Sequence, residues 1–355
     1  MHIPSALECK NRKCELADEL TKLRFVCEKE LCMELRIPPK EMVPFGLRAM
    51  KTVALANGRI DQLERDLLSA AQAVLGTTHD VDALLPIEPE ELATAVVDPQ
   101  LREQLVSGMI VMTMVDGEAS PAEVQAVEGF AAAFGIEPAY VKTLRKFAEG
   151  HTLTVRFDLA RRLWAREKLA EAWSEGGVRW LARTVAAMAR LKEDSALADR
   201  HRALRRLPES TLGGAYVAFM QRNGFQFPGE KGGGPAFVLF HDLTHVLSGY
   251  GTTPAEETQV AAFHAGARRK DPFSFIFFVM LQFHLGVRMA PTAASQHGMF
   301  DPQKVLVALR RGAACKIDPT DGWNPWPVMD RPLEALRAEY GIPPLPAAVA
   351  GSVPV

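Results

Sequence analysis

The chain has 355 residues, of which 48% are hydrophobic and 24% are charged, as in ordinary globular proteins. This composition excludes disordered and fibrous classes, and a formal net charge of -2 gives no electrostatic reason to expect a nucleic-acid partner. The segment from Met1 to Leu20 lacks the apolar stretch of a secretory signal, and no apolar run is long enough to cross a bilayer. We therefore expect a cytoplasmic protein.

Four of the five cysteines lie near the start of the chain, at positions 9, 14, 27 and 32, and the fifth is Cys315. An odd number of cysteines without a secretory signal argues against a disulfide framework. The early spacing resembles a zinc-ligand pattern, but "RFVCEKELCMELR" indicates an amphipathic helix, on which residues five apart face different sides. We expect buried free thiols, with structural zinc as the alternative.

Two segments that begin at Met50 and Met109 read as copies of one helical hairpin. In each copy an apolar helix ends at an amide or acid followed by glycine, and a capping box starts the next helix. The residues concerned are Asn57-Gly58, Asp61 and Glu64 in the first copy, and Asp116-Gly117, Ser120 and Glu123 in the second. The first part of the chain is therefore predicted to consist of helical hairpins.

This pattern resembles the tellurite-resistance TerB-like domain, a small all-helical module, over roughly residues 44–150. The resemblance implies an acidic metal-binding patch, to which Asp116, Glu118 and Glu123 correspond, whereas Asn57 departs from the pattern in the first copy. The residues also fit a simpler interpretation, in which Asp116 and Glu123 only build the turn and the cap.

The segment from Thr152 to about Ser210 indicates helices rich in arginine, alanine and leucine, with a break at residues 175–177 and three tryptophans at 164, 173 and 180. Acids and lysines are interleaved with the arginines, which favours a solvated helix face over an anionic partner. Strand signals are sparse everywhere, so we predict an all-α fold. The predicted parts are a TerB-like module with an N-terminal helix (1–150), a helical connector (151–205) and a metal-binding helical domain (206–355).

A tight helical hairpin is predicted in the last part. Residues 237–248 indicate a buried helix that stops at Gly249. Thr253 and Glu256 then form a capping box for a second helix, with Pro254 at its first position.

The hairpin concentrates side chains that bind divalent ions. His241 and His245 are four residues apart and face the same side, Asp242 flanks that side, and Glu257 lies in the first turn of the second helix, on the same face as His264. Unpaired carboxylates are costly in an apolar core, so we predict a metal site with open positions. A pair of hydrogen-bonded core histidines is the alternative. The zinc motif of metalloproteases has glutamate where this chain has Asp242, which weakens an analogy to proteolysis.

The pattern H-D-x-x-H, eleven residues, then E resembles the signature of the coenzyme Q biosynthesis protein 4 family. The matching positions are His241, Asp242, His245 and Glu257. The segments "LPESTLGGAYVAFMQRNGF" and "NPWPVMDRPLEALRAEYGI" extend the resemblance over roughly residues 206–343. Two positions depart from the family: Glu256, where glycine is usual, and His264, where an acid is common. These departures bear on the substrate more than on metal binding.

The resemblance implies an all-helical fold, isoprenoid lipid binding, membrane association and a part in ubiquinone biosynthesis, through removal of a ring carboxylate with oxidation. The residues independently allow a lipid-facing surface, because the run from Pro272, "PFSFIFFVMLQFHLGVRMA", is apolar nearly all round. A core helix is the alternative for this run. His284 within it either reaches the metal site or is a hydrogen-bonded core histidine.

We therefore expect a metal-dependent enzyme that acts on a hydrophobic, prenylated aromatic or quinone-like molecule by oxidative decarboxylation or hydroxylation. His241, His245 and Glu257 would hold the ion, with Asp242 as a fourth ligand or proton acceptor. Zinc is the first choice of ion, and iron or manganese are alternatives. A lipid-binding scaffold with a structural metal and a stress-response assembly protein are the rival functions. Expected partners are a hydrophobic small molecule or isoprenoid lipid, a peripheral membrane surface and further copies of the chain, but no nucleic acid.

Overall fold

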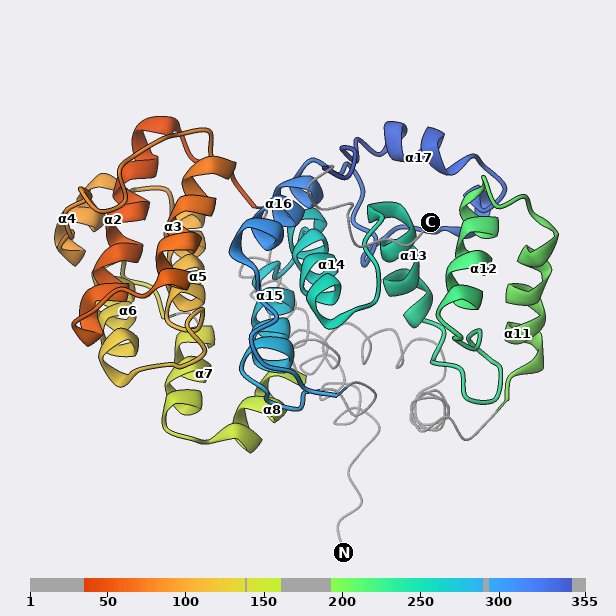
Figure 1. Ribbon diagram of the computed structural model, residues 1–355, viewed down its shortest axis with the longest axis horizontal. Coiled ribbons are helices and arrows are strands. Elements are labelled where there is room, and N and C mark those ends of the chain that lie inside the picture. Colours follow the sequence, from red (N-terminus) through yellow and green to blue (C-terminus); the bar gives the residue numbers. More distant parts are fainter. Residues whose placement is uncertain (1–34, 138, 161–192, 290–293, 347–355) are drawn as a thin grey trace, which may run out of the picture.

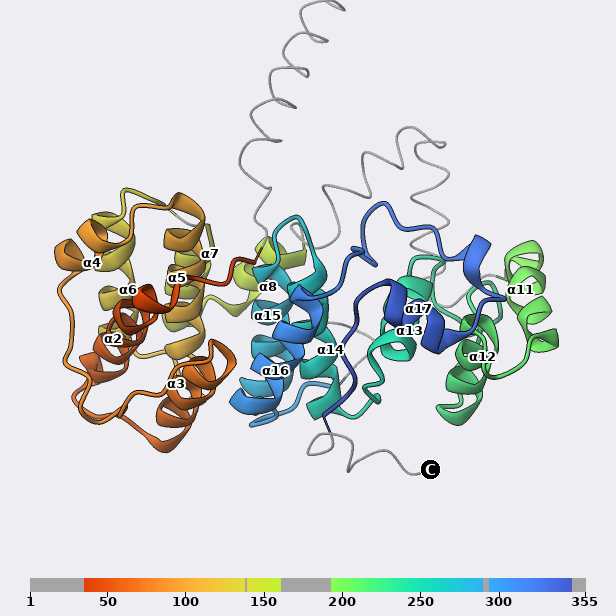
Figure 2. The same cartoon turned by 90° about the horizontal axis from the view of Figure 1, so that it is seen from above.

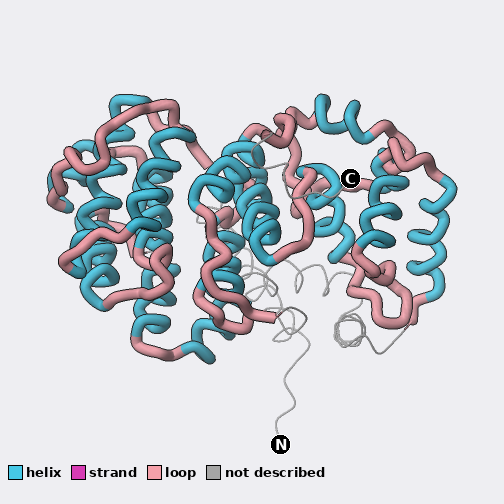
Figure 3. The backbone as a smooth tube through the Cα atoms, in the orientation of Figure 1, coloured by secondary structure: helices cyan, strands magenta, loops and turns pink. Residues whose placement is uncertain are grey.

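The computed structural model describes residues 35–137, 139–160, 193–289 and 294–346. Within these ranges the chain forms helices and no strand, apart from two isolated β-bridges (Figure 3). The predicted all-α fold is confirmed. The four early cysteines, for which buried thiols were predicted, and the three tryptophans of the predicted connector lie outside the described residues, whereas Cys315 is a buried free thiol.

The helices fall along the chain in two series. The N-terminal series is η1 (Lys40–Met42), α2 (Val43–Ala54), η2 (Leu55–Asn57), α3 (Gln62–Val74), α4 (Pro89–Ala95), α5 (Pro99–Met112), α6 (Pro121–Ala133), α7 (Ala139–Ala148) and α8 (Thr152–Ala160). The C-terminal series is α11 (Ser195–Arg202), η4 (Ala203–Arg206), α12 (Leu212–Arg222), α13 (Val238–Ser248), α14 (Pro254–Ala267), α15 (Phe273–Val279), the π-helical turn η5 (Met280–His284), α16 (Pro302–Ala313), η6 (Trp326–Val328) and α17 (Leu333–Glu339). In Figures 1 and 2, helices α2 to α7 form one group, α14 to α16 lie in the middle, and α11 to α13 lie at the other end with α17.

The two predicted hairpins are present, and their first helices end at glycines with φ of 92° at Gly58 and 96° at Gly117. A side chain at such a φ would be strained, so both turns need glycine. The first capping box is complete, since the Asp61 carboxylate accepts from the Glu64 backbone and the Glu64 carboxylate accepts from the Asp61 backbone.

The second capping box is looser than the first. Ser120 accepts from the backbone N–H of Glu123 at 3.2 Å, and the Glu123 carboxylate interacts with Ser120 in return, but without a short hydrogen bond of the kind that closes the first box. Its short hydrogen bond is from the Asn57 side-chain amide of the first copy, at 2.5 Å. The two copies are therefore joined by a hydrogen bond between their turns, which is why an amide at Asn57 is useful where the second copy has an acid.

The middle of the molecule is built on a close crossing of α14 and α16. Gly266 and Gly312 lie at this crossing, and a Cβ atom on either residue would come within 2.1 Å or 2.0 Å of a backbone carbonyl oxygen of the opposite helix. Only glycine lets the two backbones approach so closely. Because α14 also carries Glu257, this crossing fixes the helix that supplies one of the predicted metal ligands.

The phenylalanine-rich run is mostly buried, but it is not one regular helix. Helix α15 ends at Val279 and continues as the π-helical turn through His284. The His284 ring donates from Nε2 to the carbonyl oxygen of Val115 at 2.8 Å and accepts the backbone N–H of Phe300 at Nδ1. His284 is therefore the hydrogen-bonded core histidine of the two alternatives. No described helix is long and apolar enough to cross a membrane.

Candidate metal centre

Helices α13 and α14 form the predicted hairpin. Helix α13 ends at Gly249, which has φ of 81°, and α14 begins after Thr253. Thr253 and Glu256 form a complete capping box, in which the Thr253 hydroxyl accepts from the Glu256 backbone and Glu256 accepts from the Thr253 backbone. The cap satisfies backbone donors that the first turn leaves free, so it fixes the start of the helix and with it the position of Glu257.

Three side chains converge between the two helices. The Nε2 atoms of His241 and His245 are 3.1 Å apart, and the Glu257 carboxylate oxygens lie 3.5 Å from His241 Nε2 and 3.6 Å from His245 Nε2. A tetrahedral ion with bonds of about 2.0–2.1 Å has ligand atoms separated by about 3.3 Å. Among the described residues, this is the group of histidines and acids whose donor atoms are close enough to hold an ion, all within 4.8 Å of one another.

His245 is oriented by its surroundings to present a lone pair to the other two ligands. Its Nδ1 lies 3.2 Å from the carbonyl oxygen of Tyr250, which can only accept, so Nδ1 carries the proton and Nε2 is free to bind. The ring stacks on Phe219 of α12 at a centroid distance of 5.2 Å. Burial lowers the pKa of His245 to about 4, so the imidazole stays neutral at physiological pH.

Glu257 and His241 form the more open side of the group. The side chain of His241 is 44% exposed and that of Glu257 is 23% exposed, compared with 1% for His245. Burial alone would raise the pKa of Glu257, but the hydrogen bond and charge of His241, with a smaller contribution from the nearby His245, outweigh it and hold the pKa below its usual value. The site therefore combines an anionic carboxylate with access from the His241 side.

Asp242 lies next to this group without belonging to it, since its carboxylate is not among the three converging ligands. The residue is buried, and burial raises its pKa to about 7, with the Glu257 charge adding to the rise and the His241 charge opposing it. The phenol of Tyr216 on α12 is also buried, and the nearby Asp242 adds to the rise in its pKa that burial causes. Asp242 is thus a buried carboxyl group next to the three converging ligands, in surroundings that favour its protonated form.

His264 shares the site side of α14, as its spacing from Glu257 predicts. Its ring lies nearly parallel to that of His241 at 5.8 Å and to that of Phe275 at 5.0 Å, with interplanar angles of 12°. It is buried, and neither ring nitrogen has a hydrogen-bond partner among the described residues. Burial, with the neighbouring His241 and His245, holds its pKa well below the usual value, so it is a neutral aromatic wall of the site.

Two arginines support the site and were not predicted from the sequence. Arg337 of α17 donates from Nη2 to the carbonyl of Val246 at 2.7 Å and from Nε to that of Leu247 at 3.0 Å. Arg311 of α16 donates to the carbonyl of Ser248 at 2.9 Å. These hydrogen bonds satisfy the last backbone carbonyl groups of α13. The positive charges of the two guanidinium groups also interact favourably with the negative, C-terminal end of the helix dipole. The one available signal was that Arg337 lies in the closing segment "DRPLEALRAEYGI".

Comparison of the chain with family models, with curated proteins and with solved structures gives no match in any of the three. The resemblances to the coenzyme Q biosynthesis protein 4 family and to TerB-like domains therefore remain expectations from sequence motifs. Among the described residues, the acids of the TerB-like segment do not form a second metal-binding group of the kind found at His241, His245 and Glu257.

Proposed function

We propose that the protein is a divalent-metal-dependent enzyme that acts on a hydrophobic, prenylated aromatic or quinone-like molecule by oxidative decarboxylation or hydroxylation. The observation that carries the proposal is the convergence of His241, His245 and Glu257, whose facing atoms are 3.1–3.6 Å apart. Two imidazoles and a carboxylate are a donor set for zinc, iron or manganese.

The choice among these ions depends on the chemistry. The separations fit the edges of a tetrahedral zinc site, whereas two histidines and one carboxylate are also the set by which non-haem iron enzymes hold iron for oxidation. A bound divalent ion would supply a positive charge that stabilises an oxyanion developing on the substrate. We keep zinc as the first choice of ion, with iron and manganese as the alternatives for an oxidative reaction.

The chain's own residues have distinct roles in this proposal. His245 and Glu257 are the held ligands, because the Tyr250 carbonyl and the capped first turn of α14 fix them. Asp242 is the proton acceptor, since it is buried beside the three ligands and is not one of them. The rings of Phe219 and Phe275 line the surroundings with apolar surface, which favours an aromatic or prenylated substrate over a hydrophilic one.

The exposure of His241 favours an enzyme over a scaffold in which the ion is only a structural pin. Structural zinc sites are closed by four protein ligands, whereas catalytic sites keep a position for water or substrate. Three converging protein ligands with a side chain 44% exposed on one side correspond to the second arrangement. A stress-response role for the N-terminal hairpins has no comparable group of residues to support it among those described.

The test combines metal analysis with turnover. Wild-type protein loaded separately with zinc, iron(II) or manganese is offered a prenylated hydroxybenzoate in the presence of oxygen, and the product is identified by mass spectrometry. We expect about one ion per chain in wild type and far less in His245→Ala. We expect Asp242→Asn to keep the ion and to lose turnover by at least about a hundredfold.

His151→Ala is the matched control, because His151 is exposed and lies outside the site. It should retain both the ion and turnover. Unchanged metal content in His245→Ala would show that the site assignment is wrong. A wild type that does not convert the prenylated hydroxybenzoate with any of the three ions would leave the scaffold as the better function.

A further inference from the structure

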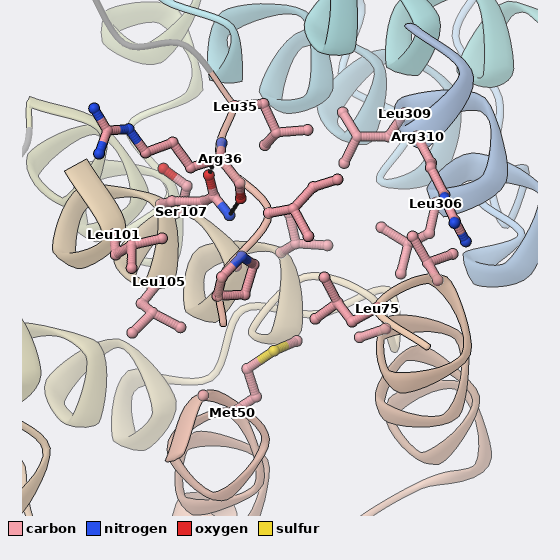
Figure 4. Close-up of a pocket in the computed structure, with 18 of the residues that line it drawn as sticks. Leu35, Arg36, Met50, Leu75, Leu101, Leu105, Ser107, Leu306, Leu309 and Arg310 are labelled. Carbon is pink, nitrogen blue, oxygen red and sulfur yellow. Dashed lines mark hydrogen bonds between the residues drawn. The ribbon is translucent and has the colours of Figure 1, made fainter. Parts of the chain in front are cut away.

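An apolar cavity lies between the N-terminal group of helices, α2 to α7, and the middle helices, α14 to α16. We call these two sets the N-terminal and C-terminal groups and the boundary between them the seam. The cavity has a volume of about 250 Å³ and is lined from one side by α2, α3 and α5 and from the other by α15, α16 and the end of α14. In Figure 4 the side chains of Met50, Leu75 and Leu105 face those of Leu306 and Leu309 across it. We call this space the seam cavity.

The seam cavity is separate from the metal centre. None of the residues that line it comes from α13, which carries His241 and His245. Helix α14 contributes a single lining residue, Ala265, and its ligand Glu257 is not in the wall. The cavity and the metal centre therefore lie on different sides of α14, and an occupant of the seam cavity would not touch the ligands.

Three of the four polar side chains in the wall, those of Arg36, Gln104 and Ser107, are already bonded within the protein. The side-chain amide of Gln104 donates to the backbone carbonyl of Arg36 and accepts from its backbone N–H, and the Ser107 hydroxyl donates to the carbonyl of Glu103. The Arg36 guanidinium pairs with Asp98 at 2.9 Å. Apart from Arg310, the wall therefore offers apolar contact and no unpaired hydrogen-bonding group, so it favours an apolar ligand over water.

One cation in the wall is different. Arg310 is exposed at the C-terminal end of α16, and its side chain makes no ion pair or hydrogen bond with a described residue. Figure 4 shows its guanidinium in the right half of the view, beside Leu306 and away from Arg36. An apolar space with a free positive charge at its rim complements a molecule with an apolar body and one anionic end.

We propose that the seam cavity binds a single long apolar chain that ends in an anionic group, of the kind found in a fatty acid. The chain lies between the helices that meet at the seam, and the head group lies at Arg310. Such a ligand bridges the N-terminal and C-terminal groups, because it touches α2, α3 and α5 on one side and α15 and α16 on the other. This proposal does not depend on the proposed metal-dependent activity.

The test uses full-length protein stripped of bound lipid and two probes of the same chain length. Oleate has a negative head, and oleyl alcohol is its uncharged counterpart. Dodecyl phosphate is a third probe, which distinguishes a carboxylate head from a phosphate head. Isothermal titration should show saturable binding of oleate to wild type, with about one molecule per chain.

Two substitutions fill the cavity from opposite walls, and one reverses the charge at the rim. Ala71→Phe on α3 and Ala313→Phe on α16 should each abolish binding of oleate and of oleyl alcohol, and one of the two suffices if the other fails to fold. Arg310→Glu should weaken oleate about tenfold and leave oleyl alcohol within about twofold. Lys304→Glu is the matched control, because it changes charge by the same amount on the same helix and is not in the wall.

The remaining outcomes either overturn a stated part of the proposal or identify the preferred head group. If wild type shows no saturable binding of any probe, or if folded Ala71→Phe and Ala313→Phe bind oleate as wild type does, the seam cavity is not a lipid site. If Arg310→Glu weakens oleyl alcohol as much as oleate, or if Lys304→Glu acts like Arg310→Glu, the head group is not at Arg310. Tighter binding of dodecyl phosphate than of oleate supports the site and identifies phosphate as the preferred head.

Discussion

At the scale of single residues, the carboxyl groups of Glu64 and Glu123 are the most unusual acids outside the metal centre. Each is buried, and each has one carboxylate oxygen without a hydrogen-bond partner among the described residues. Burial raises the pKa of both to about 7 from an ordinary value of 4.5, and the nearby acids Asp61 and Asp116 add to the rise. The folded protein therefore holds these protons more tightly than the unfolded chain does.

This difference predicts how stability depends on pH. Because the folded pKa is the higher one, the stabilisation is complete below about pH 4.5 and is lost as pH rises through about 7. We expect the free energy of unfolding to fall by about 1–3 kcal/mol for each group between pH 5 and pH 8. Urea denaturation at a series of pH values measures it.

Glu64→Gln separates this effect from the general charge of the protein. Its amide oxygen can still accept from the Asp61 backbone, but it cannot ionise, so the fall in stability with pH should be smaller than in wild type. Glu118→Gln, in an exposed position of the second turn, should leave the pH profile unchanged. A Glu64→Gln profile that overlays the wild-type profile would contradict the prediction.

The metal ligands could be read from the sequence, because their spacing is local. Four-residue spacing on one helix places His241 beside His245, and the capping box at Thr253 fixes where the next helix begins, so Glu257 follows. The partners that orient these ligands could not be read. The Tyr250 carbonyl that orients His245 is a backbone atom with no sequence signature. Arg337 reaches α13 only because the chain returns to it after a long excursion.

At the scale of helices, the crossing of α14 and α16 predicts a sharp sensitivity to one methyl group. In Gly312→Ala the new Cβ atom would lie 2.0 Å from the Phe263 carbonyl oxygen, so the two backbones must separate. We expect a loss of about 3 kcal/mol in the free energy of unfolding and weaker metal binding, because α14 carries Glu257. Thermal unfolding and metal titration measure the two effects.

Gly129→Ala is the matched control for this crossing. Gly129 also lies inside a helix, α6, but there the nearest atom to a new Cβ would be 3.9 Å away. Alanine should fit and stabilise the protein by about 0.5–1 kcal/mol, because it restricts the unfolded chain. Equal effects of the two substitutions on the free energy of unfolding would contradict the prediction that the close approach of α14 and α16 requires glycine at position 312.

The sequence predicts where helices begin and end better than it predicts whether a helix keeps regular α-helical hydrogen bonding. The bounds of α13 and α14 match the predicted hairpin, because glycine, proline and the capping residues mark them locally. The π-helical turn after Val279 was missed, since a run that is apolar on all sides contains no signal for its hydrogen-bond pattern. The looser cap at Ser120 was not predicted, because the Glu123 carboxylate makes its short hydrogen bond to Asn57, a residue distant in the chain.

At the scale of the whole molecule, the two helical groups are joined by specific bonds as well as by apolar contact. The Tyr140 hydroxyl of α7 lies 2.7 Å and 2.8 Å from the two carboxylate oxygens of Asp271, just before α15. A hydroxyl bond to a charged acceptor contributes about 1.5–3 kcal/mol. Tyr140→Phe should therefore lower the free energy of unfolding by about 1–2 kcal/mol, as measured by denaturant titration.

Tyr340→Phe is the control for the loss of a hydroxyl. Among the described residues, the Tyr340 oxygen accepts one long bond, of 3.4 Å from Trp323, so its removal should cost little. If Tyr140→Phe is as stable as Tyr340→Phe, the bond to Asp271 does not hold the two groups together. The sequence could not indicate this seam, since the apolar faces that meet there look like the core faces of any amphipathic helix.

The hydrogen bond from Asn57 to Glu123 depends on an asparagine side chain that is prone to slow deamidation. Asn57 is exposed and is followed by Gly58, and an asparagine before glycine loses its side-chain amide readily, because the small residue lets the next backbone nitrogen attack the side chain. The product is an aspartate or its isomer, which would face the Glu123 carboxylate with a second negative charge in place of a donor. Aged protein should therefore loosen first where the two copies of the hairpin meet.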